Sequence, residues 1–367
     1  MKVGLVSPYD YSYPGGVTTH IFHLERCFQE MGHEVRIMAP CSRQEGHVST
    51  NLIRLGQAIP FPSGGSFARI TLSPKLLFQV KRVLERERFD VIHAHEPLTP
   101  ALPPIVLQEA EVPRVGTFHA FHSKPRGYFW YKPVLERWFR HLDSLIAVSK
   151  PAMDFVSRHY PGDYELIPNG VDTRCFSPET PPLKELANGK RNILFVGRLE
   201  ERKGLDCLLE AYRRLKARFS DLRLVIVGPR SRLGRDYRNM SQGLDDVVFS
   251  GSVPLDMLPR YYASAFVLCA PATGEESFGM VLLEAMATGK PVVASRIDGF
   301  SQVMTHGREG LMVPPQDQDA LADALAHLLS HPGQAREMGE QGRQHAQEYE
   351  WMNVAQKVDR LYQRLLS

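Results

Sequence analysis

The stretch Lys2-Val3-Gly4-Leu5-Val6-Ser7, followed by an amphipathic run over residues 17–31, decides the fold. The first segment is a short apolar run that indicates a buried strand. In the second, apolar residues recur at steps of four and three, which places one stripe of a helix against a sheet; they are Val17, Ile21, Leu24, Phe28 and Met31. Gly32 ends this helix and residues 34–39 form the next strand, so the chain begins with a βαβ unit.

The same alternation of strands and helices continues along the chain and occurs twice. In the first half, strands are expected at residues 2–7, 34–39, 91–94, 115–118 and 144–148. In the second half, they are expected at residues 192–196, 222–227, 247–250, 266–270, 292–294 and 310–313. The predicted fold class is therefore α/β, with two Rossmann-like, doubly wound parallel sheets.

A stretch rich in proline, asparagine and glycine separates the two halves and cannot continue either sheet. We therefore predict a first domain over residues 1–168, a linker over 169–190 and a second domain over 191–350. An amphipathic helix over 351–367 is expected to pack back on the first domain. Because ligands of such sheets bind at the carboxyl ends of the strands, we expect a cleft between the domains.

Composition excludes several classes of protein. With 367 residues, 43% hydrophobic and 23% charged, the chain can form two domain cores and does not have the composition of a disordered or fibrous protein. A net charge of +3 is too small to indicate a nucleic-acid partner. The five scattered cysteines argue against a disulfide framework or a zinc ribbon. Neither a signal peptide nor a membrane-spanning run is found, which predicts a cytoplasmic protein with only peripheral membrane contact.

The first candidate anion site is the turn Pro14-Gly15-Gly16-Val17, which follows the first strand and opens into a helix. Amide groups and the helix dipole at such a turn suit phosphate. The turn departs from the G-x-G-x-x-G pattern, and no acidic residue follows the second strand, so a nicotinamide dinucleotide is not indicated. No P-loop motif occurs either. The alternative is a tight turn that needs glycine for a positive φ.

Two cations follow the first strand of the second half. Arg198 ends this strand and Lys203 precedes the next helix, so both are expected at the carboxyl edge of the sheet. An arginine fork and a lysine point charge together indicate a diphosphate. The alternative is a solvated basic loop.

Two carboxylates, Glu276 and Glu284, lie eight residues apart where a loop turns into a helix near Gly279. Carboxylates suit sugar hydroxyls, and the free amides at Gly279, Met280 and Val281 suit phosphate oxygens. The alternative is that the glutamates only complement the helix dipole.

Six motifs occur in the order typical of the retaining GT-B glycosyltransferases of family four, and the chain resembles this family over nearly its whole length. They are Pro14-Gly15-Gly16-Val17, His93-Ala94-His95-Glu96-Pro97, Thr117-Phe118-His119, Ile167-Pro168-Asn169-Gly170-Val171-Asp172, Val196-Gly197-Arg198 with Lys203-Gly204, and Glu276 with Glu284. Within the family, the chain is most similar to the branch that moves mannose from GDP-mannose to a phosphatidylinositol lipid. Pro8-Tyr9, residues 59–66 and the run to Lys124 carry that likeness.

This resemblance implies roles for the candidate residues. Arg198 and Lys203 would bind the diphosphate, with Gly16 close to it, and Glu284 would bind the ribose. Glu276 and the backbone of Phe278, Gly279 and Met280 would bind the donor sugar, and His119 would lie beside the reacting carbon. We expect His119, Arg198, Lys203 and Glu276 to be the catalytic group, with no cofactor beyond the nucleotide-sugar substrate and no metal.

Retention in this family implies front-face substitution, in which the leaving phosphate helps to deprotonate the acceptor. No carboxylate is placed as the nucleophile that a retaining glycosidase requires. His119 has two possible roles, a general base or a hydrogen-bonding group that positions substrate, and the family favours the second. His93, His95 and Glu96 have metal-ligand chemistry, but the family makes them structural or acceptor-side residues.

A basic amphipathic helix is expected over residues 74–89. Leu76, Leu77, Val80, Val83 and Leu84 form its apolar face. Its cations include Lys75, Lys81, Arg82 and Arg86, which could hold the helix on anionic lipid at the inner face of the cell membrane. The alternative is an ordinary helix packed on the first sheet.

The acceptor is less determined than the donor site. Tyr9, Thr18, His119 and Lys124 are the expected acceptor-binding residues. The inositol-lipid branch has polar residues where this chain has Thr18, Leu98 and Ala120, which leaves another headgroup open. Transfer of a hexose from a UDP-sugar to a diacylglycerol or soluble acceptor is the first alternative. A nucleotide-sugar epimerase and a non-catalytic binding module are the others.

Overall fold

The computed structural model describes residues 1–13, 15–42, 49–63, 66–119, 132–230 and 235–367. The chain forms two compact units. The first unit contains residues 1–169 and 351–367, and the second contains residues 170–350. Residues 170–190, most of the linker predicted from sequence, belong to the second unit, where Leu183 and Leu186 are buried in its core.

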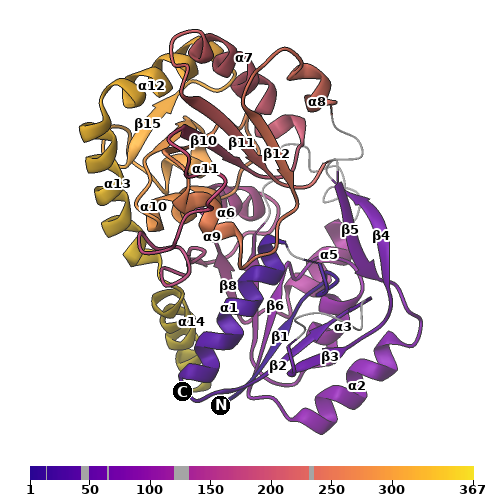
Figure 1. Ribbon diagram of the computed structural model, residues 1–367. Helices are drawn as coiled ribbons and strands as arrows, with labels where there is room; N and C mark the ends of the chain where they lie inside the picture. The colour runs from indigo at the N-terminus through magenta and orange to yellow at the C-terminus, as the bar shows by residue number, and fades with distance from the viewer. Residues whose placement is uncertain (14, 43–48, 64–65, 120–131, 231–234) are drawn as a thin grey trace. The chain divides into compact units, whose positions relative to one another are not determined.

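The first unit is built on a seven-stranded parallel sheet with the order β3-β2-β1-β6-β7-β8-β9 (Figure 1). Its strands are β1 (Lys2–Val6), β2 (Glu34–Ala39), β3 (Leu52–Arg54), β6 (Val91–His95), β7 (Arg114–Phe118), β8 (Ser144–Ala147) and β9 (Tyr164–Leu166). The five predicted strands are present. The short edge strands β3 and β9 have no counterpart in the prediction, because three residues are too few to form a pattern.

An antiparallel hairpin is the other element of the first unit that the sequence did not indicate. It consists of β4 (Ala58–Ser63) and β5 (Ser66–Thr71), which pair only with each other. Figure 1 shows the hairpin standing apart from the main sheet of its unit. Pro60 and Pro62 lie in β4, and proline argues against a strand because it donates no ladder hydrogen bond.

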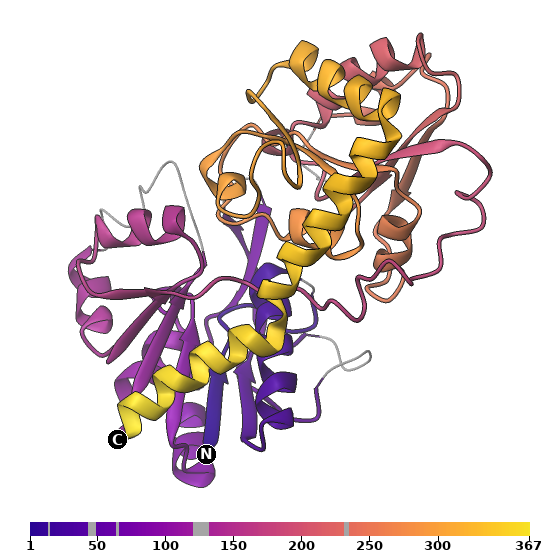
Figure 2. The ribbon, with the colours of Figure 1, turned by 90° about the vertical axis from the view of Figure 1, so that its left-hand side faces the viewer.

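Helices cover the sheet of the first unit. They are α1 (Gly16–Glu30), α2 (Leu76–Glu87), α3 (Leu102–Glu109), α5 (Lys132–Phe139), α6 (Lys150–Ser157) and α14 (Trp351–Leu366). The predicted stripe of α1 is buried at Ile21, Leu24 and Phe28. The last helix, α14, packs against α1, and the chain ends close to its beginning (Figure 2).

The second unit is built on a six-stranded parallel sheet with the order β12-β11-β10-β13-β14-β15. Its strands are β10 (Arg191–Val196), β11 (Leu222–Val227), β12 (Val247–Gly251), β13 (Val267–Ala270), β14 (Val292–Ser295) and β15 (Gly310–Val313). All six match the predicted strands within a residue or two. Its helices are α7 (Leu205–Lys216), α8 (Tyr237–Met240), α9 (Leu258–Ala263), α10 (Met280–Ala287), α11 (Asp298–Ser301), α12 (Gln318–Ser330) and α13 (Pro332–Ala346).

Both sheets have one topological switch point, where the chain reverses its direction across the sheet. It lies between β1 and β6 in the first unit and between β10 and β13 in the second. A crevice forms outside the carboxyl ends of the strands at such a point, and ligands of open α/β sheets bind there. The segments that follow these four strands therefore define the candidate site in each unit.

Candidate functional site

In the second unit, the segment after β10 places a cluster of charges at the switch point. A 3₁₀ turn over Glu201–Lys203 follows Arg198, and Gly204 is the residue that precedes α7. Gly204 has a φ of 69°, and a Cβ there would lie 1.9 Å from the carbonyl oxygen of Pro271, which directly follows β13. Only glycine fits this position, so the glycine fixes the approach of Lys203 to the loop after β13.

Glu276 is the centre of the charge cluster. Its Oε1 atom lies 2.6 Å from Nζ of Lys203 and 2.6 Å from Nη1 of Arg202. Glu200 continues the network, because its Oε2 atom lies 2.9 Å from Nε of Arg202. Arg198 is half exposed, and its Nη1 atom lies 4.0 Å from Oε1 of Glu200. The structure therefore brings Lys203 and Glu276 into contact and places Arg198 at the edge of the same network.

The start of α10 borders this cluster. Gly279 precedes the helix with a φ of 103°, and a Cβ there would lie 2.7 Å from a ring carbon of Phe300. Phe278 is buried, whereas Met280 and Val281 are partly exposed in the first turn. The amides of a first turn have no partner within their helix, so this end of α10 can bind the oxygens of an anion.

Glu284 lies one turn further along α10. The hydroxyl group of Tyr262 on α9 donates a hydrogen bond of 2.5 Å to its Oε2 atom. Burial raises the pKa of the Glu284 carboxyl to about 7, although the bond from Tyr262 lowers it. Since its side chain keeps some exposed surface, this carboxyl group can accept a further hydrogen bond from a ligand hydroxyl.

In the first unit, Gly16 is the first residue of α1, after β1. The residue before it, Gly15, is fully extended, with a φ of −169°, and Gly16 has no positive φ either. A Cβ added to Gly16 would meet no described atom within 4 Å. The alternative of a turn that needs glycine for its backbone conformation is therefore wrong, and neither packing nor φ explains this glycine.

His119 follows β7 and is held from two sides. Its Nε2 atom lies 3.0 Å from Nδ1 of His95, which ends β6, and its backbone amide donates a 2.7 Å hydrogen bond to Oε1 of Glu96. The ring of His20 lies 4.8 Å from that of His119, edge to face. Burial first, and the neighbouring histidines second, lower the pKa of His119 well below its usual range. His119 is therefore a neutral imidazole at neutral pH.

The predicted acceptor-binding residues differ in their surroundings. Tyr9 follows β1, and burial together with the charge of Glu96 raises the pKa of its hydroxyl group. Thr18 is buried, and its hydroxyl group lies within hydrogen-bond distance of two carbonyl oxygens, those of Tyr13 at 3.1 Å and Gly15 at 3.0 Å. Its single hydrogen is therefore used inside the turn, which leaves only lone pairs for a ligand. Lys124 lies outside the described residues.

The predicted apolar face of helix α2 is correct except at one residue, Leu77. Leu76, Val80 and Val83 are buried in the core of the first unit, as the alternative of an ordinary packed helix requires. Leu77, which was assigned to the same face, is 44% exposed, and Phe78 beside it is 72% exposed. In a helix, residue 77 points about 100° away from residue 76, so it leaves the stripe.

The cations of α2 all lie on the surface. Lys75, Lys81, Arg82 and Arg86 are exposed; Lys81 pairs with Glu109 at 3.2 Å, and Arg86 pairs with Glu87 at 2.6 Å. Leu72, just before the helix, is 54% exposed. This surface of the first unit therefore combines basic side chains with large apolar ones.

Sequence reasoning missed four residues of these clusters: Glu200, Arg202, Tyr262 and His95 as the partner of His119. Arg202 had a signal, since it is a second cation next to Lys203 in the same short turn. His95 ends β6 and His119 follows the neighbouring strand β7, and only the pairing of His95 with Thr117 brings them together. Tyr262 comes from α9, and nothing in the sequence links it to Glu284.

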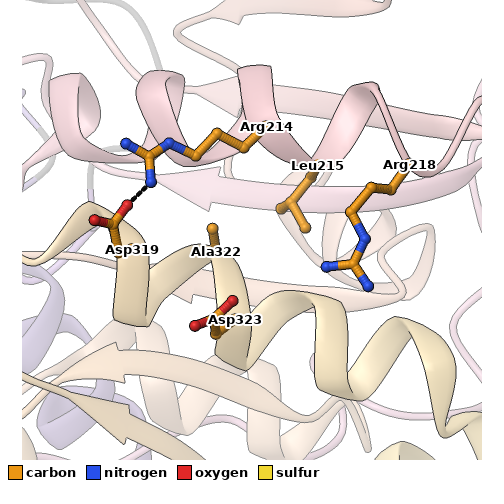
Figure 3. Close-up of a pocket in the computed structure, with 6 residues that line it drawn as sticks. All are labelled: Arg214, Leu215, Arg218, Asp319, Ala322 and Asp323. Atoms are coloured by element: carbon orange, nitrogen blue, oxygen red, sulfur yellow. Dashed lines mark ion pairs between the residues drawn. The ribbon is translucent and has the colours of Figure 1, made fainter.

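A pocket lies elsewhere in the second unit, between α7 and α12. Figure 3 shows its lining residues, which are Arg214, Leu215, Arg218, Asp319, Ala322 and Asp323. Among these residues, Arg214 on α7 pairs with Asp319 on α12. None of the predicted site residues lines this pocket. Two of its charged side chains, Arg214 and Asp319, already neutralise each other. We therefore do not include this pocket in the candidate site.

Two further properties bear on function. Over the residues that the structure describes, no group of three or more histidine, cysteine, aspartate or glutamate side chains is arranged to hold a metal ion. Among the helices of those residues, none combines the length and the apolar character that crossing a bilayer requires.

Comparison with known families and proteins adds an independent finding. Residues 14–174 match the family described as Glycosyltransferase Family 4, and residues 190–331 match that described as Glycosyl transferases group 1. The phosphatidyl-myo-inositol mannosyltransferase of Mycobacterium leprae (strain TN) is 37% identical over 365 residues, which cover 99% of this chain and 96% of that protein.

Solved structures share the fold at lower identity. Sucrose-phosphate synthase from Thermosynechococcus elongatus has a TM-score of 0.78 and 24% identity, over 99% of this chain and 98% of that chain. Anabaena HepE, solved in complex with UDP-glucose, has a TM-score of 0.78 and 19% identity, over 99% of this chain and 100% of that chain. The two α/β units therefore have the fold of GT-B glycosyltransferases.

Proposed function

This chain belongs to glycosyltransferase family four, and from that premise we propose that it transfers mannose from GDP-mannose to a phosphatidylinositol lipid, with retention of the anomeric configuration. One observation carries the proposal: the similarity to phosphatidyl-myo-inositol mannosyltransferases extends over 99% of the chain at 37% identity. This similarity therefore extends over the segments that follow the switch-point strands in both units, where the candidate site residues lie.

The charge cluster of the second unit supports the donor half of the proposal. A glycosyl transfer from a nucleotide sugar leaves a diphosphate, on which negative charge develops as the glycosidic bond breaks. Lys203 and Arg202 already lie within ion-pair distance of Glu276, and Arg198 lies at the edge of the network. Preorganised cations of this kind stabilise the leaving group without a change of their own positions. Glu276 itself offers oxygen atoms to the hydroxyl groups of the donor sugar.

In the proposed reaction, the acceptor hydroxyl attacks the anomeric carbon from the face that the diphosphate leaves, and a diphosphate oxygen takes the hydroxyl proton. The bond from the carbon to the diphosphate breaks as the new glycosidic bond forms, so no enzyme nucleophile is needed. Cationic side chains and the first turn of α10 stabilise the departing charge, and no divalent metal is required for this. His119 and Tyr9 bind on the acceptor side.

The surface of α2 supports action at a membrane. Its exposed cations suit anionic lipid, to which each contributes about 1 kcal/mol near the surface. On the same helix, most of the surface of Phe78 and nearly half of that of Leu77 are exposed. Apolar side chains of this size anchor an amphipathic helix at the boundary of lipid headgroups and acyl chains. We infer that α2 holds the enzyme peripherally on the inner face of the cell membrane, next to its lipid acceptor.

The test is to incubate the purified protein with GDP-mannose or UDP-glucose, without liposomes, with liposomes that contain phosphatidylinositol, and with liposomes that contain diacylglycerol instead. Released nucleotide and labelled lipid are both measured. We expect GDP release and lipid labelling that both depend on phosphatidylinositol. Turnover only with UDP-glucose, or only with diacylglycerol liposomes, would refute the proposed substrates while the glycosyltransferase fold remains. Analysis of the product by NMR gives the anomeric configuration.

A further inference from the structure

The two histidines His95 and His119 are directly hydrogen-bonded in the interior of the first unit. The bond joins Nδ1 of His95 to Nε2 of His119 over 3.0 Å. Neither ring carries a charge at neutral pH, because burial lowers the pKa of both well below the usual range. Each neutral imidazole has one N–H donor and one bare nitrogen, so the bond has only two possible directions.

The second nitrogen of His95 distinguishes these two directions. Its Nε2 atom is buried and has no hydrogen-bond partner among the described residues. If Nδ1 of His95 accepted the bond, Nε2 would carry the hydrogen, and a buried N–H group would be left without an acceptor. If Nδ1 donates the bond, Nε2 is a bare lone pair. An unpaired buried N–H group is rarer and more costly than an unpaired buried lone pair, so the direction in which Nδ1 of His95 donates is favoured.

Among the described residues, the polar side chains around His95 are engaged with other groups. The ring of His93 stacks on it at 4.4 Å, and both nitrogens of His93 are engaged, with the hydroxyl groups of Tyr362 at 2.5 Å and Thr117 at 2.6 Å. The Nδ1 atom of His20 lies 2.7 Å from Oδ1 of Asn169. The backbone of His119 is fixed in turn by Glu96.

We propose that His95 is a positioning residue that donates its Nδ1 hydrogen to Nε2 of His119 and so fixes His119 as the Nδ1–H tautomer. The only bare nitrogen of His119 is then occupied by His95. His119 retains one hydrogen-bond donor, its Nδ1–H group, and has no lone pair with which to remove a proton from an acceptor hydroxyl.

The consequence for catalysis rests on the proposed function, whereas the tautomer does not. In a glycosyl transfer, His119 would donate a hydrogen bond to an oxygen of the substrate, and the base would be the leaving diphosphate. Of the two roles that the sequence left open for His119, the tautomer selects positioning.

The decisive measurement is a long-range ¹H–¹⁵N NMR spectrum of the ¹⁵N-histidine-labelled full chain, without substrate. The signals of His119 are identified by their loss in His119→Asn. We expect the pattern of an imidazole protonated at Nδ1. The pattern of an Nε2–H tautomer would overturn the proposal. Because this readout needs no turnover, it stands whether or not the chain proves to transfer mannose.

Three variants test the role of His95. His95→Leu removes the donor, so His119 should lose its single tautomer and kcat should fall about tenfold, the effect of one hydrogen bond, with little change in the donor KM. His95→Asn keeps a nitrogen donor near the place of Nδ1, so it should restore both the single tautomer of His119 and kcat. Tyr362→Phe is the matched control, because it removes an equally buried hydrogen bond of the same cluster, the one to Nδ1 of His93, and leaves the rings of His93, His95 and His119 in place.

An unchanged His119 tautomer in His95→Leu would overturn the proposal, as would an equal change in Tyr362→Phe. If the leucine variant does not fold, the spectra of the wild-type chain and of His95→Asn decide. Both should then show His119 protonated at Nδ1.

Discussion

Glu276 and Lys203 form an ion pair, with Oε1 of the carboxylate 2.6 Å from Nζ of the lysine. The family resemblance implies separate tasks for these residues, with Glu276 on the donor sugar and Lys203 on the diphosphate. Their contact means that the two tasks are physically coupled, because the position of each side chain depends on the charge of the other. Arg202 contacts the same oxygen atom, so the loss of Lys203 leaves the carboxylate with one cation.

Lys203→Ala should lower kcat/KM for the donor about a hundredfold or more, since it removes a preorganised cation from the developing negative charge of the leaving group. The measurement is the rate of nucleotide release with phosphatidylinositol liposomes. Lys216→Ala serves as the control, because Lys216 is a similarly buried lysine of the same unit that pairs with Asp246 at 2.7 Å. Near-normal turnover in Lys203→Ala would remove this residue from the site.

Glu276→Gln should impair turnover more than it impairs binding of the free nucleotide. The amide keeps the size of the side chain, but it loses the charge that holds Lys203 and Arg202 and accepts hydrogen bonds less strongly from sugar hydroxyls. Binding of GDP by calorimetry and the rate of mannosyl transfer are compared in the same preparation. An equal loss of both would contradict a contact with the sugar.

The sheets could be predicted from sequence because their central strands contain continuous apolar runs between amphipathic helices, as residues 193–196 of β10 illustrate. The β4–β5 hairpin could not, since Pro60 and Pro62 argue against a strand and the ladder pairs only with itself. The helix over residues 74–89 was predicted, but Leu77 was placed on the wrong face because hydropathy alone does not fix where a stripe ends.

The candidate site was predictable to a similar extent. Motif order gave Lys203 and Glu276, which the structure joins in one ion pair. The bond between His95 and His119 depends on the register of β6 with β7, and the bond from Tyr262 to Glu284 depends on how α9 packs on α10. A single sequence contains neither relation, so contacts between side chains of different elements were the part that required a structure.

The effect of Glu284→Gln on the free energy of unfolding should be more favourable at pH 8 than at pH 5. The folded pKa of Glu284 is raised to about 7, from an ordinary value near 4.5. Below pH 4.5 both folded and unfolded chains are protonated at this site. As the pH rises toward 7, the unfolded chain ionises first, so the folded state loses stability, by an amount on the order of 3 kcal/mol above pH 7. Urea unfolding of both proteins at the two pH values measures the difference, and a pH-independent difference would contradict the raised pKa.

Gly16→Ala should leave stability unchanged or raise it by about 0.5–1 kcal/mol, because a Cβ there meets no described atom and alanine is the better helix former. We expect mannosyl transfer to fall at least tenfold if the backbone at Gly16 approaches the donor. Gly333→Ala is the matched control, since Gly333 lies in the first turn of α13 and a Cβ there also meets nothing within 4 Å. Full activity in Gly16→Ala would place the donor away from this turn.

Charge reversal on α2 should weaken both membrane association and lipid glycosylation. In a variant with Lys75→Glu, Arg82→Glu and Arg86→Glu, sedimentation with anionic vesicles should fall at least tenfold, since each exposed cation contributes about 1 kcal/mol near the surface. Reversal of Arg218, Arg238 and Arg336, exposed cations of the second unit, changes the net charge equally and should leave binding nearly unchanged. Phe78→Ser separates the apolar contribution, and its effect should persist at high salt, where the cations are screened. If the α2 variant binds vesicles as the wild type does, this helix does not hold the protein on the membrane.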